Sequence, residues 1–239
     1  KDITDFSAAV REVLKAGKEK EYEVSSVCFA GAGRVSEKND LCTITKLPWN
    51  IDADDIQRKT TLRSVVIIND FIAVAYGIHC LPSDKIIQLK TGTKISTKPI
   101  AILGAGTGLG KAVLVWNHFT KRYIPVASEG GHSDAALQTK EEFEFGEFIK
   151  KKYARERVVW EDVLSGNGIS NVYQFLEITG KYLSSKYSLQ IQKSKYDSAL
   201  ISTFQQDPHC KATLDIFLRF YARCAQNLAL DVMALGGIY

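Results

Sequence analysis

The residues whose types and spacing best indicate chemistry lie in the segment Pro99–Trp116. In this segment Gly104, Gly106, Gly108 and Gly110 fall between two apolar runs that are typical of β-strands. Glycine tolerates a positive φ and lets backbone N–H groups approach a ligand closely. Successive N–H groups in such a turn form a concave site for an anion. We therefore predict that this turn binds phosphate.

Two common phosphate-binding motifs do not fit this segment. A Walker-A loop read from Gly110 and Lys111 would need a glycine at Ala105 and a hydroxyl residue at Ala112. Both registers of the dinucleotide-binding motif fail as well, because their third glycine falls on Leu109 or on Lys111. The chain also continues into an apolar strand rather than a helix. The segment is therefore predicted to be a β-hairpin.

A flexible loop is the simpler alternative for these glycines. Their strict alternation, with Thr107 among them, specifies more than flexibility requires. Lys111 follows the hairpin and could either reach a bound phosphate or be a solvated surface charge. The sequence leaves both roles of Lys111 open.

A second candidate, Asn69-Asp70, stands between an apolar strand and a helix. Val65–Ile68 has no polar residue on either face and is predicted to be a central strand, and Phe71–Tyr76 opens the helix. Ligands of open α/β sheets bind beyond the carboxyl ends of the strands. A helix N-terminus would keep Asp70 ionised, so that it could accept a proton from a hydroxyl nucleophile. The alternative is a simple helix cap, which is the commoner role for such an aspartate.

A third group of candidates is the motif Glu129-Gly-Gly-His132 together with Glu161. The two glycines would let a ligand come close. Taken singly, His132 fits a surface turn and Glu161 fits a solvated charge at a helix start. Together with Asn69 and Asp70, these side chains supply the donors and acceptors that bind the hydroxyl groups of a polyol. Their co-occurrence indicates a polyol site.

A mixed α/β framework has to position these residues, and a length of 239 residues allows two lobes. Strands are predicted at Val24–Ala30, Leu41–Thr45, Val65–Ile68, Lys85–Leu89, Ile100–Leu103, Ala112–Trp116 and Arg122–Ser128. Helices are predicted over Ile3–Gly17, Asp52–Thr60, Phe71–Tyr76, Phe143–Tyr153, Asp197–Phe204 and Lys211–Leu235. A further helix is predicted to follow a turn at Ser165–Gly168 and to end at Phe175. In the last helix, Leu218 is expected to face inward. The order of these elements indicates two lobes.

Composition narrows the classes of partner. A formal net charge of +4 is too dilute to indicate a nucleic-acid partner, and it mildly favours an anionic ligand. No apolar run is long enough to cross a bilayer, so no membrane partner is expected. Five scattered cysteines without a Cys-x-x-Cys pair indicate a reducing compartment, the cytoplasm, rather than a disulfide framework. Cys28 and Cys42 are predicted to be core residues.

Four motifs, taken in order, resemble those of bacterial-type glucokinases, which are members of the hexokinase/actin-like ATPase superfamily. They are Ile68–Phe71, Gly104–Gly110, Ser128–His132 and Glu161–Gly166. The resemblance is dense from residue 65 to 175, weaker before it, and absent from about 180 to 209. It implies a two-lobed actin-like ATPase fold of the ribonuclease H-like type. A small α/β lobe (residues 1–80) and a larger α+β lobe (residues 81–239) would close over a ligand cleft.

The resemblance also implies a role for each motif. Asp70 would take the proton from the 6-hydroxyl of a hexose, above all D-glucose, while ATP with Mg²⁺ donates the phosphoryl group. The sugar would be bound by Asn69, Asp70, Glu129, His132 and Glu161. ATP would be bound along its phosphates by Gly104, Gly106, Thr107, Gly108 and Gly110, and on its adenosine side by Ser165, Gly166, Gly236 and Gly237.

The sequence departs from the family pattern at several points. The Asp-x-Gly-Gly-Thr turn of the family would precede Lys1 and its last strand and helix would follow Tyr239, so we expect an internal piece of a longer protein. Gly31 replaces a frequent proline and Lys46 an asparagine, which leaves the sugar preference open. Residues 133–152 lack the cysteines of the zinc motif in the related repressor/kinase branch, so no zinc or other metal site is predicted.

Three classes of function are compared. A hexose kinase that makes glucose 6-phosphate at the entry to glycolysis is favoured, because Asp70 would supply the base that such a reaction needs. A hexose-binding sensor on the same fold would need no base, and a DNA-binding segment before Lys1 would favour it. A nucleotide-dependent oxidoreductase is disfavoured by the absent dinucleotide motif. The sequence does not give the oligomeric state, and a homodimer is one arrangement considered.

Overall fold

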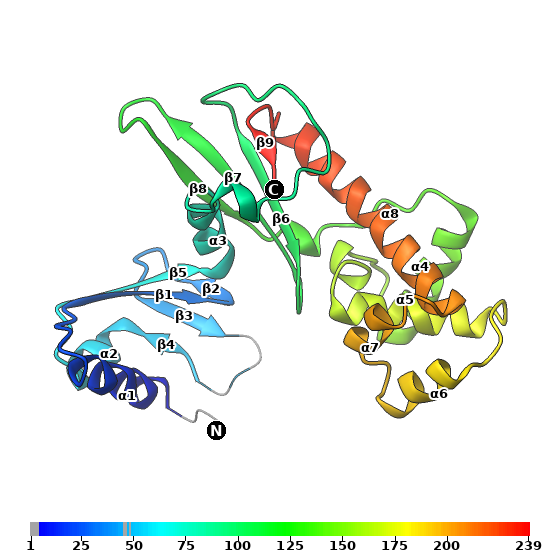
Figure 1. The fold of residues 1–239 in the computed structure, drawn as a ribbon, viewed down its shortest axis with the longest axis horizontal. Helices are drawn as coiled ribbons and strands as arrows, with labels where there is room; N and C mark the ends of the chain where they lie inside the picture. Colours follow the sequence, from blue (N-terminus) through cyan, green and yellow to red (C-terminus); the bar gives the residue numbers. More distant parts are fainter. Residues whose placement is uncertain (1–4, 45–46, 48) are drawn as a thin grey trace. The chain divides into compact units, whose positions relative to one another are not determined.

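A computed structural model describes residues 5–44, 47 and 49–239 of the chain (Figure 1). The chain divides into two compact units, Lys1–Gln88 (unit 1) and Leu89–Tyr239 (unit 2). Both units combine helices and strands, which confirms the predicted mixed α/β class. The lobes expected from the sequence differ from these units in the placement of residues 81–88. The expectations for Ile3, Thr45 and Lys46 fall outside the described residues.

Unit 1 combines a parallel strand pair with a small antiparallel sheet. Strands β1 and β5 run parallel and place Gly31 opposite Asn69. The antiparallel sheet has the order β2-β3-β4. The elements are α1 (Phe6–Lys18), β1 (Ser26–Gly31), β2 (Gly33–Val35), β3 (Leu41–Ile44), β4 (Ile51–Asp52), α2 (Ala53–Lys59), β5 (Ser64–Asn69), α3 (Asp70–Ile78) and the 3₁₀ helix η1 (Ser83–Lys85).

The core of unit 1 forms where α1 and α2 pack on the strands. Helix α1 begins after Asp5, whose side chain accepts the N–H of Ser7, and it turns Val10 into the core. Helix α2 contacts both α1 and β5, and Ser7 donates to Asp55 across the helix pair at 2.6 Å. The buried residues are Val10, Cys42, Ile51, Ala53, Ile56, Leu62, Val65 and Ile67.

Unit 2 is built on a sheet with the strand order β8-β7-β6-β9. Strands β6 (Ile100–Ala105) and β7 (Leu109–Asn117) form the predicted hairpin, and β8 (Arg122–Ser128) pairs antiparallel to β7. Strand β9 (Gly237–Ile238) runs parallel to β6. The helices are η2 (Gly130–His132), α4 (Lys140–Tyr153), η3 (Trp160–Asp162), α5 (Gly166–Ile178), α6 (Lys186–Lys193), α7 (Ser198–Thr203) and α8 (Pro208–Asp231).

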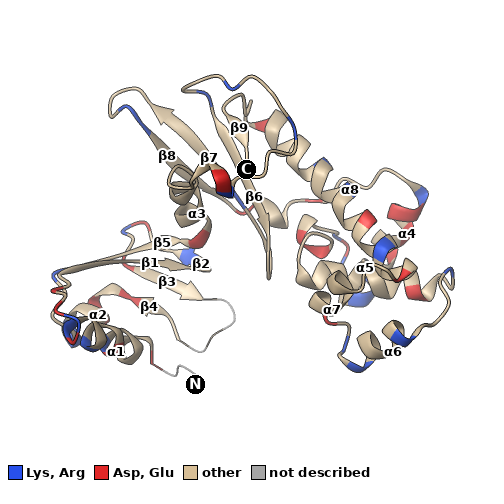
Figure 2. Cartoon of the chain, viewed as in Figure 1, with Lys and Arg blue, Asp and Glu red and all other residues tan. Residues whose placement is uncertain are grey.

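The core of unit 2 joins this sheet to helices α4, α5 and α8. Ala101, Leu103 and Leu109 of the hairpin belong to one buried cluster with Phe220 and Cys224 of α8. Helix α4 begins with a capping box at Thr139, with acidic residues in its first turn and lysines in its last (Figure 2). This distribution of charge opposes the helix dipole and stabilises both ends.

Several predicted elements differ from the structure. Lys85–Leu89 forms no strand, and Ile87 and Leu89 are 85% and 94% exposed. Strand β5 is not central, because it pairs with β1 alone among the described strands and Val66 is exposed. Apolar runs therefore overstate burial at both places.

Other differences concern single residues and short elements. Cys42 is buried as predicted, but Cys28 is exposed, and so is Leu218 on α8. The predicted turn at Ser165–Gly168 is already the start of α5, with Ser165 as its N-cap. Strands β2, β4 and β9 and helix α6 were not predicted. In the described ranges no helix has both the length and the apolarity needed to cross a membrane.

Candidate functional site

The junction of β5 and α3 in unit 1 positions Asn69 and Asp70. The Asn69 side-chain oxygen accepts the N–H groups of Phe71 and Ile72, at 2.9 and 3.3 Å. Asn69, rather than Asp70, is therefore the cap of α3. Asp70 is the first helical residue, and its Oδ1 accepts the N–H of Phe71 at 3.0 Å. The alternative that Asp70 is the N-cap is thus wrong.

Gly31 and Cys42 lie close to this junction. A Cβ at Gly31 would come within 2.5 Å of the Cys42 Sγ, so only glycine fits opposite Asn69. Burial raises the pKa of the Cys42 thiol, and the negative charge of Asp70 raises it further. Cys42 therefore stays a neutral packing residue behind the junction.

The tip of the glycine hairpin in unit 2 consists of residues 106–108. Gly104 pairs with Gly110 and Ala105 with Leu109, so the strands close on these three residues. Gly106 N–H donates to the Gly108 carbonyl at 2.8 Å. Neither Gly106 nor Gly108 has a φ in the left-handed region, contrary to the conformational reason expected for glycine here. A Cβ at Gly108 would instead collide with the Glu161 carboxylate at 2.6 Å, whereas a Cβ at Gly106 would meet nothing within 4 Å.

The N–H groups of the tip are only partly available to an anion. Leu109 N–H donates to Glu161 Oε2 at 3.0 Å, and Gly106 N–H is used inside the turn. Within the described chain, the N–H groups of Thr107 and Gly108 have no such acceptor. The expected row of free donors is thus reduced to these two.

The segment Glu161–Gly166 holds the tip from outside. Glu161 binds Leu109, and Gly166 N–H donates to the Gly106 carbonyl at 2.9 Å. Ser165 is buried, donates from Oγ to the Glu161 carbonyl and accepts the N–H of Gly168 as the cap of α5. Glu161, Ser165 and Gly166 are thereby brought together with the hairpin.

The turn Glu129-Gly-Gly-His132 also reaches the hairpin. A Cβ at Gly131 would overlap the carbonyl oxygen of Leu109, so this turn packs directly on the base of the tip. Nε2 of His132 lies 3.9 Å from Oε2 of Glu129, and the Glu129 and His132 side chains are 83% and 63% exposed. Both side chains are therefore accessible to a ligand.

Lys111 is buried, which rules out the alternative of a solvated charge. Only 7% of the residue is exposed, and its ammonium group lies 5.6 Å from the centre of the Trp160 ring. The position of a Cβ at Gly130 would be 3.4 Å from Lys111 Nζ. Burial raises the pKa of the neighbouring Cys224 thiol, and a hydrogen bond with Lys111 opposes that rise. Lys111 thus supports the Gly130–His132 turn from beneath.

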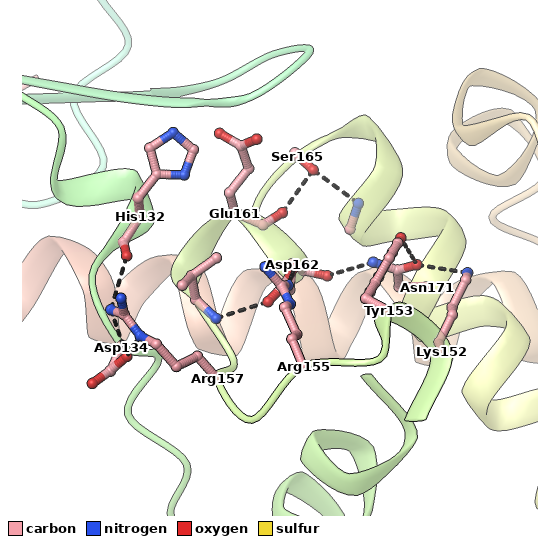
Figure 3. A network of polar contacts seen from close by, with 12 residues as sticks. His132, Asp134, Lys152, Tyr153, Arg155, Arg157, Glu161, Asp162, Ser165 and Asn171 are labelled. Carbon is pink, nitrogen blue, oxygen red and sulfur yellow. Dashed lines mark hydrogen bonds and ion pairs between the residues drawn. The ribbon is translucent and has the colours of Figure 1, made fainter. Parts of the chain in front are cut away.

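A polar network behind Glu161 was not predicted from the sequence. Asp162 accepts the N–H of Val159 at 2.7 Å and pairs with Arg155, while its carbonyl accepts from Asn171 (Figure 3). Arg157 binds the carbonyl of His132 and the carboxylate of Asp134. In Figure 3 the side chains of His132 and Glu161 point away from this network. The signal that could have indicated it is the density of charged residues in 152–162.

Gly236 and Gly237 lie at the edge of the sheet where β9 meets β6. A Cβ at Gly236 would be 2.5 Å from the Lys98 carbonyl oxygen, and Gly237 has a φ of 125°. Both positions therefore need glycine for the parallel pairing to form. Asn69 and Asp70 belong to unit 1, whereas all the other predicted site residues belong to unit 2.

Comparison with known proteins gives one family. The sequence model of the family described as Glucokinase matches residues 1–239. A glucokinase of Synechocystis sp. is 34% identical over 233 residues, which cover 90% of this chain and 64% of that protein. A glucokinase of Shigella sonnei is 31% identical over 238 residues, 100% of this chain and 70% of that protein. The crystal structure of a glucokinase from an Antarctic psychrotroph matches 99% of this chain and 69% of its own, with a TM-score of 0.76 at 27% identity.

Proposed function

The chain belongs to the glucokinase family, and from this premise we propose that the full-length protein phosphorylates the 6-hydroxyl of D-glucose with ATP. The chain spans only 64% of the length of its Synechocystis relative, so the activity is proposed for the whole protein. The observation that carries the proposal is that two of the family motifs, Ser128–His132 and Glu161–Gly166, both contact the tip or base of a third, the Gly104–Gly110 hairpin. Glu161, Gly166 and Gly131 all contact residues of that tip or its base.

We assign the proton transfer to Asp70. Phosphoryl transfer to an alcohol needs positioning, charge neutralisation and a group that accepts the hydroxyl proton. Asp70 is partly exposed in the first turn of α3, so its carboxylate is accessible to a sugar hydroxyl. Asn69 has its oxygen engaged in the cap, so its amide N–H₂ group is what it would offer to a sugar hydroxyl.

The remaining sugar contacts are proposed for Glu129, His132 and Glu161. Glu129 and His132 are exposed, and Glu161 has its Oε2 on Leu109, which leaves Oε1 for a hydroxyl. Carboxylates accept hydrogen bonds from hydroxyls, and an imidazole can donate or accept. These three side chains therefore supply complementary contacts to a hexose.

The nucleotide is proposed to lie along the hairpin as the magnesium complex of ATP. The N–H groups of Thr107 and Gly108 would donate to its phosphates, with Gly104, Gly106 and Gly110 leaving room for close approach. Ser165 and Gly166, with Gly236 and Gly237, are proposed on the adenosine side. Because the Ser165 hydroxyl is engaged in the α5 cap, its contribution would come from the backbone.

A cytoplasmic location is part of the same proposal. All five cysteines are free, which suits a compartment that keeps thiols reduced. Cytoplasm is also where ATP and glucose would meet such an enzyme.

The proposal is tested by ADP release from the full-length protein with glucose, mannose, N-acetylated hexoses or no sugar. We expect the highest kcat/KM with glucose and only background release without sugar. A hexose-binding sensor would bind glucose in calorimetry and release no ADP above background. That outcome would contradict the kinase assignment and support a hexose-binding sensor instead.

A further inference from the structure

Glu161 belongs to the proposed sugar site, yet its carboxylate also holds the glycine hairpin. Its Oε2 accepts the N–H of Leu109 at 3.0 Å, across 52 residues of sequence. The side chain is half-buried, and Ser165 Oγ anchors its backbone carbonyl at 2.8 Å. The carboxylate is therefore fixed at the base of the tip.

Gly108 provides the space that this carboxylate occupies. A Cβ at Gly108 would lie 2.6 Å from Glu161 Oε2 and 3.1 Å from its carboxyl carbon. Since the φ of Gly108 lies outside the left-handed region, room for Glu161 rather than backbone conformation explains glycine at this position. At Gly106, by contrast, a Cβ would meet nothing within 4 Å.

We propose that Glu161 is a positioning residue that couples the two substrates, an inference that rests on the proposed function. Oε2 holds the hairpin tip in the form that leaves the N–H groups of Thr107 and Gly108 free for phosphate. Oε1 remains for a sugar hydroxyl. A sugar bound at Oε1 restrains the same carboxylate that holds Leu109, so sugar and nucleotide strengthen each other's binding reciprocally.

A second contact to the hairpin tip comes from the same short segment, Glu161–Gly166. Gly166 N–H binds the Gly106 carbonyl at 2.9 Å, five residues after Glu161 binds Leu109. The two contacts lie on opposite sides of the tip. The Ser165 hydroxyl donates to the Glu161 carbonyl and so links the residues that make them. Loss of the Glu161 carboxylate would leave the tip held on one side only.

The test measures ADP binding to the full-length protein by calorimetry, with and without glucose, for Glu161→Ala and Glu161→Gln. A hydrogen bond to a charged group is lost in Glu161→Ala, so we expect ADP to bind about tenfold more weakly even without sugar. Glu161→Gln keeps an oxygen for Leu109, so its ADP affinity without sugar should stay within about twofold of wild type. Both variants should raise the KM for glucose, because neither keeps two acceptor oxygens.

Two further variants make the test specific. Glu156→Ala removes an exposed carboxylate from the loop before η3 and should leave ADP affinity unchanged. Gly108→Ala keeps the carboxylate but displaces it, so it should weaken ADP binding as Glu161→Ala does. Thermal unfolding of each variant identifies any that fails to fold.

The proposal is overturned if Glu161→Ala binds ADP in the absence of sugar as tightly as wild type. It is also overturned if Glu161→Gln loses as much ADP affinity as Glu161→Ala, since the hydrogen bond to Leu109 would then not explain the loss of affinity. These results are independent of turnover. A wild-type protein that releases no ADP with glucose would remove the proposed kinase while the hold on the hairpin could still be measured.

Discussion

The two units position their proposed site residues in different ways. In unit 1, Asn69 and Asp70 are neighbours in sequence, and one local cap at the start of α3 places both. In unit 2, the hairpin tip takes its shape from Glu161, Gly166 and Gly131, which come from distant segments. Changes in unit 1 should therefore alter chemistry with little cost in stability. Loss of long-range contacts in unit 2 should lower stability first.

The largest expected effect is on chemistry in unit 1. Replacement of Asp70 by alanine should lower kcat by about 10³-fold, within the usual range for loss of a general base. Calorimetric glucose binding should stay measurable, because other side chains are proposed to bind the sugar. ADP release in the presence of glucose provides the rate.

Asp54→Ala is the matched control for this substitution. Asp54 is also an aspartate in the first turn of a helix of unit 1, but it is exposed on α2. Its removal should leave kcat unchanged. Near wild-type turnover by Asp70→Ala would remove Asp70 from the role of base.

The next largest effect is expected on the stability of unit 2. Arg223 donates to both oxygens of Glu142, at 2.9 and 3.0 Å, and Glu142 is 3% exposed. Arg223→Ala would leave a buried carboxylate without its main partner and should cost about 3–5 kcal/mol in urea unfolding. Arg219 reaches the same carboxylate only at 3.8 Å and is half-exposed, so Arg219→Ala should cost far less. Equal losses in the two variants would contradict this account of the pair.

The same carboxylate predicts a dependence of stability on pH. Burial alone would raise the pKa of Glu142, but hydrogen bonds from Arg223 and from two backbone N–H groups lower it below its ordinary value of 4.5. A lowered folded-state pKa means that the stabilisation is complete above the unfolded pKa and is lost as pH falls through the folded one. Urea unfolding from pH 7 to pH 3 should show a steeper acid loss in wild type than in a Glu142→Gln variant. Parallel curves would show that Glu142 does not contribute.

The smallest effect is expected at the cap of α3. Asn69→Ala removes the acceptor for two N–H groups and should cost about 1 kcal/mol of unfolding free energy. Asn69→Asp retains an accepting oxygen and should recover most of that loss. A cost of several kcal/mol for Asn69→Ala would mean that unit 1 depends on this residue for more than a local cap.

Features that depend on local contacts could be predicted from the sequence, whereas features that depend on long-range contacts could not. The hairpin and β8 were predicted because strand patterns and turn residues are local signals. The junction at Asn69-Asp70 was located by its strand-to-helix pattern, although the cap proved to be Asn69. Local pattern thus gives the position of an element and leaves the division of roles within it open.

Features set by long-range contacts could not be predicted. The burial of Lys111 depends on Trp160 and Gly130, which no local pattern around Lys111 reveals. The hydrogen bond from the Leu109 N–H to the Glu161 carboxylate joins residues that are 52 positions apart in the sequence. The apolar run at Lys85–Leu89 forms no strand, because no described strand pairs with it. Side-chain pattern alone does not say whether a pairing partner exists.

The central claim is the proposal that the full-length protein transfers a phosphoryl group from ATP to the 6-hydroxyl of glucose. Its most direct test follows the product when the full-length protein is given glucose and magnesium ATP, with glucose 6-phosphate and ADP quantified in the same samples. The account predicts one glucose 6-phosphate for each ADP, and neither product above background without sugar. ADP formed without glucose 6-phosphate, or a phosphate found on another hydroxyl, would contradict it.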